Sequence, residues 1–184
     1  SRWFGSKRTF GDFLVEDDKV RELVKKRLEN AAVSDVIIER YANRVRINIH
    51  TARPGIVIGR KGQDIERLRE QLSRITGKDI YMEIREVKDP ERNAQLVAEN
   101  IAMQMERRVS FRRAMKRAVQ LAMENGALGI KIHMGGRLGG SELAREEMAK
   151  DGKTPLHTLD ANVQYGFAEA DTTPMAWALI LVFG

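Results

Sequence analysis

The sequence predicts a mixed α+β protein built from two domains, residues 1–88 and 89–184. The first half reads as helix, strand, strand, short helix, glycine-bracketed loop, longer helix and strand, whereas the second reads as two helices followed by extended segments. Lys88-Asp89-Pro90 marks the boundary, because proline disfavours helix at the residue before it and readily begins the next one.

The first three elements follow from apolar spacing. After the acidic Glu16-Asp17-Asp18, helical spacing predicts a helix that ends near Asn30 and carries Val20, Leu23, Val24 and Leu28. Val33 to Arg40 is expected to form a strand. Arg44 to His50 alternates strictly between polar and apolar residues, which is typical of a strand with one solvated face.

The remaining elements of the first domain surround the glycine loop. Pro54 is expected to begin a short helix that reaches Gly59. A longer helix then carries Ile65, Leu68, Leu72 and Ile75, and it stops at Gly77. Alternating Ile80, Met82 and Ile84 indicate the third strand.

In the second domain, we expect a helix from about Glu91 to Arg108 and another from Phe111 to Asn125, with Ser110 as N-cap and Gly126 as terminator. Three extended segments follow, marked by the alternating apolar runs 128–134 and 159–167 and by the continuous run 176–183. Residues 141–151 favour helix by composition, yet the glycines on either side also allow a hairpin, so both remain open.

The most informative motif is Gly59-Arg60-Lys61-Gly62. Glycines let the backbone approach a ligand closely, and the amides and dipole at the start of the next helix favour a phosphate. This is the GXXG loop with which KH domains clamp the backbone of single-stranded nucleic acid, and the surrounding order matches the type II KH arrangement. The alternative is a glycine-rich turn between two core helices. No aromatic residue stands in the loop, which favours backbone holding over base reading.

Six cations fall within eleven residues that contain no acid: Arg107, Arg108, Arg112, Arg113, Lys116 and Arg117. At about 100° per residue, an apolar stripe through Phe111, Ala114 and Met115 lies opposite Arg112, Arg113, Lys116 and Arg117. A purely solvated helix normally mixes charge signs to gain i,i+4 pairs. We therefore favour RNA contact over a solvated face.

The chain shows no pattern typical of an enzyme or a cofactor protein. Gly135 to Gly140 lacks the dinucleotide-binding spacing and is expected to be a tight loop in which Arg137 is a candidate RNA contact. Gly152-Lys153-Thr154 is not a phosphate loop of the Walker type, because Glu147 stands where glycine is required. The three histidines show no metal-ligand spacing and there is no cysteine. We expect no catalytic residue, no metal site and no cofactor.

Charge points to nucleic acid as the partner. The chain carries a formal net charge of +6, and residues 1–88 hold 20 Lys and Arg against 14 Asp and Glu. No apolar run approaches the roughly 18 residues of a membrane span, so no membrane partner is expected.

Several strings together resemble the bacterial form of the ribosomal protein S-three family of the small subunit. They include Thr51 to Gly59, Gln95 to Ala102, Glu106 to Lys116, Gly136 to Glu142 and Pro155 to Leu159. The resemblance runs from about Val20 to Thr173. The chain departs from the family in its last segment, Pro174 to Phe183, which is continuously apolar where the family usually alternates and carries a lysine.

The resemblance implies a type II KH domain followed by a two-layer domain of two helices on a mostly antiparallel sheet, which favours the hairpin for residues 141–151. It implies a structural protein in the head of the small subunit, in the cytoplasm or an organelle, bound to small-subunit ribosomal RNA. Arg112, Arg113 and Lys116 would face incoming messenger RNA and support its unwinding. Expected neighbours are ribosomal proteins S-ten and S-fourteen, with S-four and S-five around the channel through which messenger enters. The competing hypothesis is a free KH-type RNA-binding regulator or transcription factor.

Overall fold

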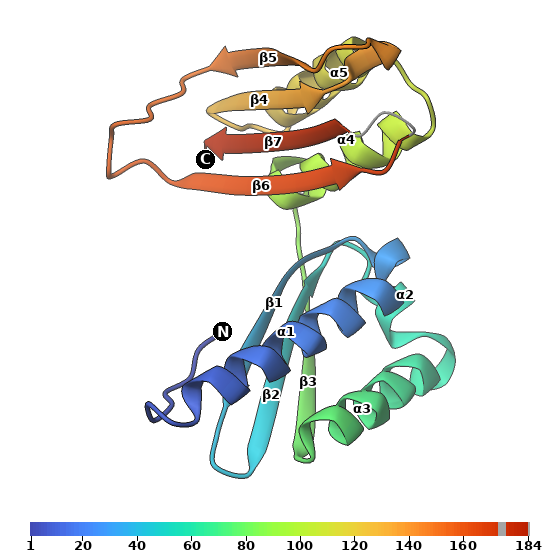
Figure 1. Cartoon of the computed structure of the whole chain (residues 1–184), viewed down its shortest axis with the longest axis vertical. Coiled ribbons are helices and arrows are strands. Elements are labelled where there is room, and N and C mark those ends of the chain that lie inside the picture. Colours follow the sequence, from blue (N-terminus) through green and yellow to red (C-terminus); the bar gives the residue numbers. More distant parts are fainter. Residues whose placement is uncertain (173–175, 184) are drawn as a thin grey trace. The chain divides into compact units, whose positions relative to one another are not determined.

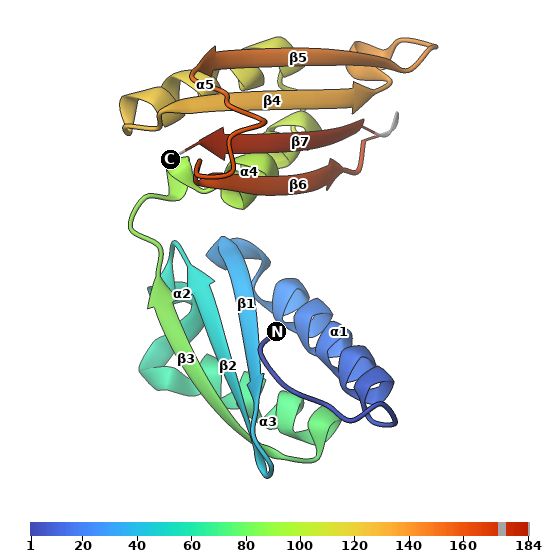
Figure 2. The ribbon, with the colours of Figure 1, turned by 90° about the vertical axis from the view of Figure 1, so that its left-hand side faces the viewer.

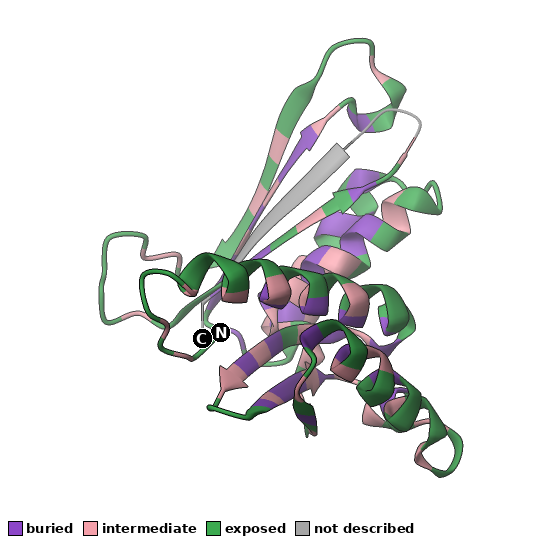
Figure 3. Cartoon of the chain, turned by 60° about the horizontal axis from the view of Figure 1, so that its bottom comes forward, coloured by how far each residue is buried: buried purple, intermediate pink, exposed green. Residues whose placement is uncertain are grey.

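The computed structural model describes residues 1–172 and 176–183, and the chain folds as two compact units, Ser1–Lys88 and Asp89–Gly184 (Figure 1). Pro174 and Met175, which open the atypical apolar segment, lie outside the described residues. In both units helices pack on one face of a sheet, so their outer surfaces are exposed and their inner surfaces buried (Figure 3).

The first unit has the predicted order of elements. They are α1 (Phe10–Arg27), a 3-10 turn (Glu29–Ala31), β1 (Val33–Arg40), β2 (Arg44–Thr51), α2 (Pro54–Ile58), a second 3-10 turn (Arg60–Gly62), α3 (Gln63–Thr76) and β3 (Asp79–Glu86). The sheet order is β1-β2-β3, with β1 antiparallel and β3 parallel to β2 (Figure 2). Val20 and Val24 of α1 and Leu72 of α3 pack with Ile38 and Ile47 in one apolar core, which fixes both helices to the same sheet face.

The first helix begins earlier than predicted. It starts at Phe10, so Glu16 and Asp17 lie inside it rather than before it. Acidic residues near an apolar stripe resemble the first turn of a helix in sequence, but here Asp17 points to the buried side and is 2 % exposed. The prediction was wrong because the partner that neutralises this carboxylate is remote in sequence.

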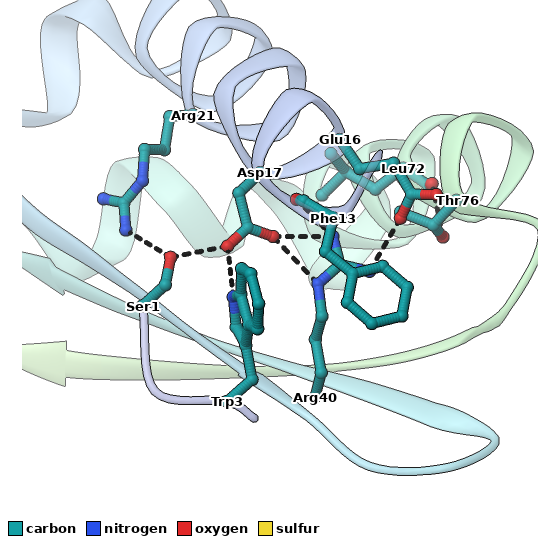
Figure 4. A network of polar contacts seen from close by, with 9 residues as sticks. All are labelled: Ser1, Trp3, Phe13, Glu16, Asp17, Arg21, Arg40, Leu72 and Thr76. Carbon is teal, nitrogen blue, oxygen red and sulfur yellow. Dashed lines mark hydrogen bonds and ion pairs between the residues drawn. The ribbon is translucent and has the colours of Figure 1, made fainter. Parts of the chain in front are cut away.

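That partner is Arg40 at the end of β1 (Figure 4). Its guanidinium donates to Asp17 at 2.6 Å and to Glu16 at 2.6 Å, and it lies 4.9 Å from the centre of the Phe13 ring. Asp17 also accepts hydrogen bonds from the Trp3 indole at 2.7 Å and the Ser1 hydroxyl at 2.6 Å. The network therefore joins α1, β1 and the segment before α1 through a single buried carboxylate.

The opposite face of the first sheet is polar. Arg46 on β2 donates a short hydrogen bond to Glu83 on β3 and lies over the ring of Tyr81. Hydrogen bonding to Arg46, followed by hydrogen bonding to Arg85, lowers the pKa of the Glu83 carboxyl. The same contact with Glu83 raises the pKa of Arg46. This exposed pair keeps both charges at neutral pH.

The second unit consists of two helices on a four-stranded sheet. Its elements are a 3-10 turn (Pro90–Arg92), α4 (Ala94–Glu106), α5 (Phe111–Glu124), β4 (Gly129–Gly136), a 3-10 turn (Leu138–Gly140), β5 (Arg145–Gly152), β6 (Val163–Ala170) and β7 (Ala176–Phe183). The sheet order is β5-β4-β7-β6 and all three strand pairs are antiparallel. Ile101 of α4 and Ala114 of α5 pack on Ile130, Ile132 and Met134 of β4.

The first helix of this unit is shorter than predicted. Residues 90–92 form a 3-10 turn, and Asn93 adopts an extended conformation in which its side chain accepts a hydrogen bond from the Leu96 amide at 3.2 Å. Asparagine is a strong N-cap because its side-chain oxygen satisfies an unpaired amide of the first turn. The helix therefore begins at Ala94 and not at Glu91.

The structure decides two of the extended segments, one of which the sequence left open between helix and hairpin. Residues 145–152 form β5, which confirms the hairpin. The strand expected from Leu159 instead begins at Val163, and Leu159 is fully exposed in the preceding turn. The apolar set of this strand also lies on the outer face, since Tyr165 is 60 % exposed while Gly166 and Ala170 are buried. Alternation thus located this strand but placed its start too early.

Helix α4 and β6 approach each other closely at Gly166. A Cβ at that position would lie 2.2 Å from the backbone oxygen of Ala94. Next to this contact, the side chain of Gln95 on α4 forms two hydrogen bonds with the backbone of Phe167 on β6. It accepts from the Phe167 amide at 3.2 Å and donates to the Phe167 carbonyl at 3.0 Å. One glutamine side chain thus satisfies two backbone groups on the outer edge of β6, where no neighbouring strand pairs with them.

Candidate nucleic-acid interface

Both glycines of the loop have backbone angles that only glycine adopts without strain. Gly59 has φ 68° and ψ −171°, and Gly62 has φ 74° and ψ 10°. Lys61 between them is also left-handed, with φ 55°, a region that costs an L-residue roughly 1–2 kcal/mol. The loop delivers the chain into α3, whose first amides have no partner within the helix and attract anions.

Both loop cations face solvent. Arg60 and Lys61 are exposed, and no acid in the described parts of the chain lies within ion-pairing distance of either. Ile56 and Ile58 beside the loop remain 46 % and 43 % exposed. Leu68, in contrast, is 5 % exposed and belongs to the core. The loop thus combines free positive charge with an apolar flank.

Helix α5 separates its faces as the angular pattern predicts. Phe111, Ala114 and Met115 are buried. The opposite face exposes Arg112, Arg113, Lys116 and Arg117. Ser110 occupies the N-cap position, but its side chain accepts no hydrogen bond from the helix. Arg112 lies 3.6 Å from Glu147 of β5, an acid that the helix sequence alone does not reveal.

Arg107 and Arg108 lie between the helices and not on either one. Arg107 is the C-cap of α4, and Arg108 follows it with φ 61°. The Arg108 amide donates to Met105 at 2.9 Å and the Val109 amide to Gln104 at 3.0 Å, the hydrogen-bond pattern of a Schellman motif. Glycine usually occupies this left-handed position. Because arginine stands there instead, the sequence did not indicate the motif that ends α4.

Replacing Arg108 by Gly should raise the stability of the second unit, because glycine adopts φ 61° without the strain of a side chain. The gain should stay below about 1 kcal/mol, since glycine also loses more backbone entropy on folding. Urea unfolding checks the change, with Arg107→Gly, at ordinary φ, as the control. A loss of stability in R108G equal to that of R107G would contradict a strained Arg108.

The structure brings Arg108 and Arg137 to one hollow of about 520 Å³. Its wall includes the start of α5 at Ser110 and the left-handed Gly139 and Gly140. Arg137 donates to the Ser141 carbonyl at 2.9 Å, which fixes one side of its guanidinium. Glu106 and Asp171 also line the hollow. Arg108 and Arg137, two cations predicted from separate motifs, therefore line the same hollow at the start of α5.

One cation at this surface escaped prediction. Arg145 of β5 lies 5.5 Å from the centre of the Phe111 ring, and Arg112 lies 5.6 Å from it. The pairing of β5 with β4 carries Arg145 opposite Gly136, close to the start of α5. Only the strand register reveals this neighbour, because 34 residues separate it from Phe111 in the chain.

No metal-binding cluster of acids and histidines forms among the residues that the structure describes. Within residues 1–172 and 176–183, no three His, Asp or Glu side chains are placed to hold a metal ion. No helix in the same residues has both the length and the apolar character needed to cross a bilayer.

Comparison with known proteins identifies the family. The profile described as KH domain matches residues 19–92, and the one described as ribosomal protein S3, C-terminal domain, matches residues 101–176. Small ribosomal subunit protein uS3 of Methylacidiphilum infernorum is 56 % identical over 174 residues, which cover 94 % of this chain and 81 % of that protein. The chain belongs to the uS3 family. The uS3 proteins of Magnetococcus marinus and Desulforamulus reducens are 57 % and 55 % identical, again over 94 % of this chain and over 82 % and 78 % of theirs.

Membership confirms the predicted fold, a type II KH domain followed by the C-terminal domain of the family. It also confirms the prediction of a structural protein rather than an enzyme. The S3 profile ends at Ala176, the first residue of β7. From Ala176 on, the apolar segment that departs from the family in sequence forms the last strand.

Proposed function

We propose that this chain is a structural constituent of the small ribosomal subunit in the cytoplasm, and that it holds ribosomal RNA and messenger RNA on two different surfaces. The uS3 relatives carry the name of that subunit. The observation that supports messenger binding best is the exposed basic face of α5, with Arg112, Arg113, Lys116 and Arg117 opposite a buried apolar face. The buried face anchors the helix, so the cations are free to contact a ligand.

This arrangement supports passive unwinding of messenger structure. Arg113, Lys116 and Arg117 form no ion pair within the described residues, whereas Arg112 pairs with Glu147 at 3.6 Å, so three of the four cations have no competing acid. Cations that hold the phosphates of one strand let translocation pull that strand away from its complement. The work comes from translocation, so the chain itself needs no nucleotide site. Arg107, Arg108 and Arg137 extend the basic surface to the hollow beside α5.

The KH loop supplies the second surface. Gly59 and Gly62 bring the backbone close to a phosphate while Arg60 and Lys61 add charge. We assign this loop to ribosomal RNA. The neighbours proposed in the head of the subunit are ribosomal proteins S-ten and S-fourteen, with S-four and S-five at the channel through which messenger enters.

Changing Arg112, Arg113 and Lys116 together to Ala should leave the fold and incorporation into subunits intact, because all three are exposed and their loss opens no cavity. Translation of unstructured messages should be nearly normal, and reading through a stable hairpin placed at the channel mouth should slow. Each lost phosphate contact should flatten the slope of log affinity against log salt by roughly 0.7 for single strands.

The matched control is Lys25, Lys26 and Arg27 changed together to Ala, which removes three exposed cations from the end of α1. It should leave hairpin read-through unchanged. Equal read-through of hairpins by the α5 variant and wild type would refute the messenger role. Poor incorporation with an equal defect on every message would instead assign α5 to ribosomal RNA.

Changing Arg60 and Lys61 to Asp should weaken binding of single-stranded RNA, because it reverses the charge at the phosphate site. Folding should change by less than about 0.5 kcal/mol, as is usual for exposed loop positions. Binding is measured at moderate salt, with Lys25 and Lys26 changed to Asp as a charge-matched control. If both double variants bind as wild type does, the loop is not a phosphate clamp.

The competing function is a free KH-type regulator. Sedimentation of tagged protein through a sucrose gradient separates the two functions, since a ribosomal constituent co-migrates with small subunits. Failure to co-migrate would sink the ribosomal assignment and favour the regulator.

A further inference from the structure

The side chain of Asp64 lies directly against the KH loop. A Cβ built on Gly59 would fall 1.9 Å from Asp64 Oδ2, 2.6 Å from its Cγ and 2.8 Å from its Cβ. Asp64 therefore fills the space beside the first glycine of the loop. No other loop glycine has such a neighbour, because a Cβ on Gly62 would meet only Ile65, at 3.9 Å.

The carboxylate of Asp64 makes no hydrogen bond or ion pair with any residue that the structure describes. Nearby Glu66, in contrast, pairs with Arg69 at 2.8 Å. Asp64 is the second residue of α3, where free amides and the helix dipole favour an anion. An unpaired negative charge thus occupies the neighbourhood to which the loop would bring a phosphate.

We propose that Asp64 sets the affinity of the KH loop for the phosphodiester backbone of single-stranded RNA, acting as an intramolecular anion that opposes the incoming phosphate. The inference rests on the proposed function of the loop. In the free protein the acid offsets part of the charge of Arg60 and Lys61. On binding, phosphate and carboxylate share one small region, and their repulsion lowers the affinity that the two cations alone would give.

Charge arithmetic gives the size of the effect. Repulsion between unit charges roughly 6 Å apart in water weakens binding by about threefold. Salt screens this repulsion because both groups lie at the surface. The effect of Asp64 should therefore be largest at low salt and shrink as salt is added. A loop whose affinity is lowered in this way releases RNA faster than a loop without the opposing charge.

The test compares Asp64→Asn with Glu66→Gln in the full chain. Both variants remove one negative charge from the first turn of α3 and nearly preserve side-chain shape, but only Asp64 touches the loop. The probe is a fluorescent single-stranded RNA of about 10 nucleotides, near the footprint of a single-strand-binding module, and the readout is its anisotropy. D64N should bind about threefold more tightly at low salt, and E66Q should bind as wild type does.

The same titrations in the Arg60→Asp, Lys61→Asp background complete the cycle. There the gain from D64N should disappear, because no phosphate is held beside it. Equal gains in D64N and E66Q would overturn the inference in favour of a general charge effect, and so would unchanged or weaker binding by D64N. If charge reversal of the loop leaves wild-type affinity unchanged, the clamp itself fails, which is a different result from failure of Asp64 alone.

Discussion

Replacing Arg40 by Met should destabilise the first unit by about 3–5 kcal/mol, the usual effect of removing one partner from a buried ion pair. The side chains of Arg40 and Asp17 are 4 % and 3 % exposed. Without Arg40, the Asp17 carboxylate keeps, among the described residues, only the Ser1 hydroxyl and the Trp3 indole as donors. Methionine retains most of the length of arginine, so lost packing contributes little to the effect.

Arg46→Met is the matched control, because Arg46 also pairs with a carboxylate and lies over an aromatic ring but is 38 % exposed. Exposed pairs contribute about 0–1 kcal/mol. Hydrogen exchange in urea, followed on peptides of β1 with peptides of β4 as internal reference, measures the loss in each unit. Similar losses in R40M and R46M would show that burial of the Asp17 pair does not matter. Adding Asp17→Asn to R40M should recover part of the stability, since the unpaired charge is then gone.

Replacing Gly166 by Ala should destabilise the second unit by about 1–3 kcal/mol, as overpacking of a tight contact does. The new methyl group would meet the Ala94 oxygen at 2.2 Å and the Gln95 nitrogen at 2.5 Å. These are backbone atoms at the start of α4, so the helix must shift as a whole. The shift would also break the two hydrogen bonds between Gln95 and Phe167.

Faster hydrogen exchange at the Phe167 amide measures that loss. Gly55→Ala is the control, because its Cβ would meet nothing within 4 Å and the residue is helical. That variant should be neutral or slightly more stable, since alanine favours helix over glycine. Unchanged exchange at Phe167 in G166A would show that α4 does not depend on this close approach.

Local patterns predicted the parts of the molecule that local physics determines. Strict alternation located β2, angular spacing gave the buried and exposed faces of α5, and the glycine spacing located the loop, in which Gly59 and Gly62 both have positive φ. The role of the loop and of the α5 cations in binding RNA stays a prediction. The order of elements was sufficient for the KH fold because each element has its own short-range signal.

Part of what the sequence did not reveal depends on residues far apart in the chain. Asp17 looked like part of a helix start because its partner, Arg40, is 23 positions away. The end of α4 was misplaced because an arginine occupies the left-handed position that glycine usually marks. The start of β6 was placed too early because the apolar alternation continues back to Leu159, which lies in a turn and is fully exposed. The first of these errors arose where a tertiary contact overrode a local preference, and the second where a local motif lacks the residue type that usually marks it.

The strand order of the second unit has a consequence for its synthesis on the ribosome. β7 lies between β4 and β6, although it follows both in the chain. A nascent chain can therefore pair β4 with β5 as soon as both have emerged, but β6 has no strand partner until Phe183 has been made. The sheet is therefore completed late, when β7 inserts between β4 and β6. This is a non-local step of the kind that slows folding and invites association between chains. The hydrogen bonds between Gln95 and Phe167 hold β6 to α4 in the interval.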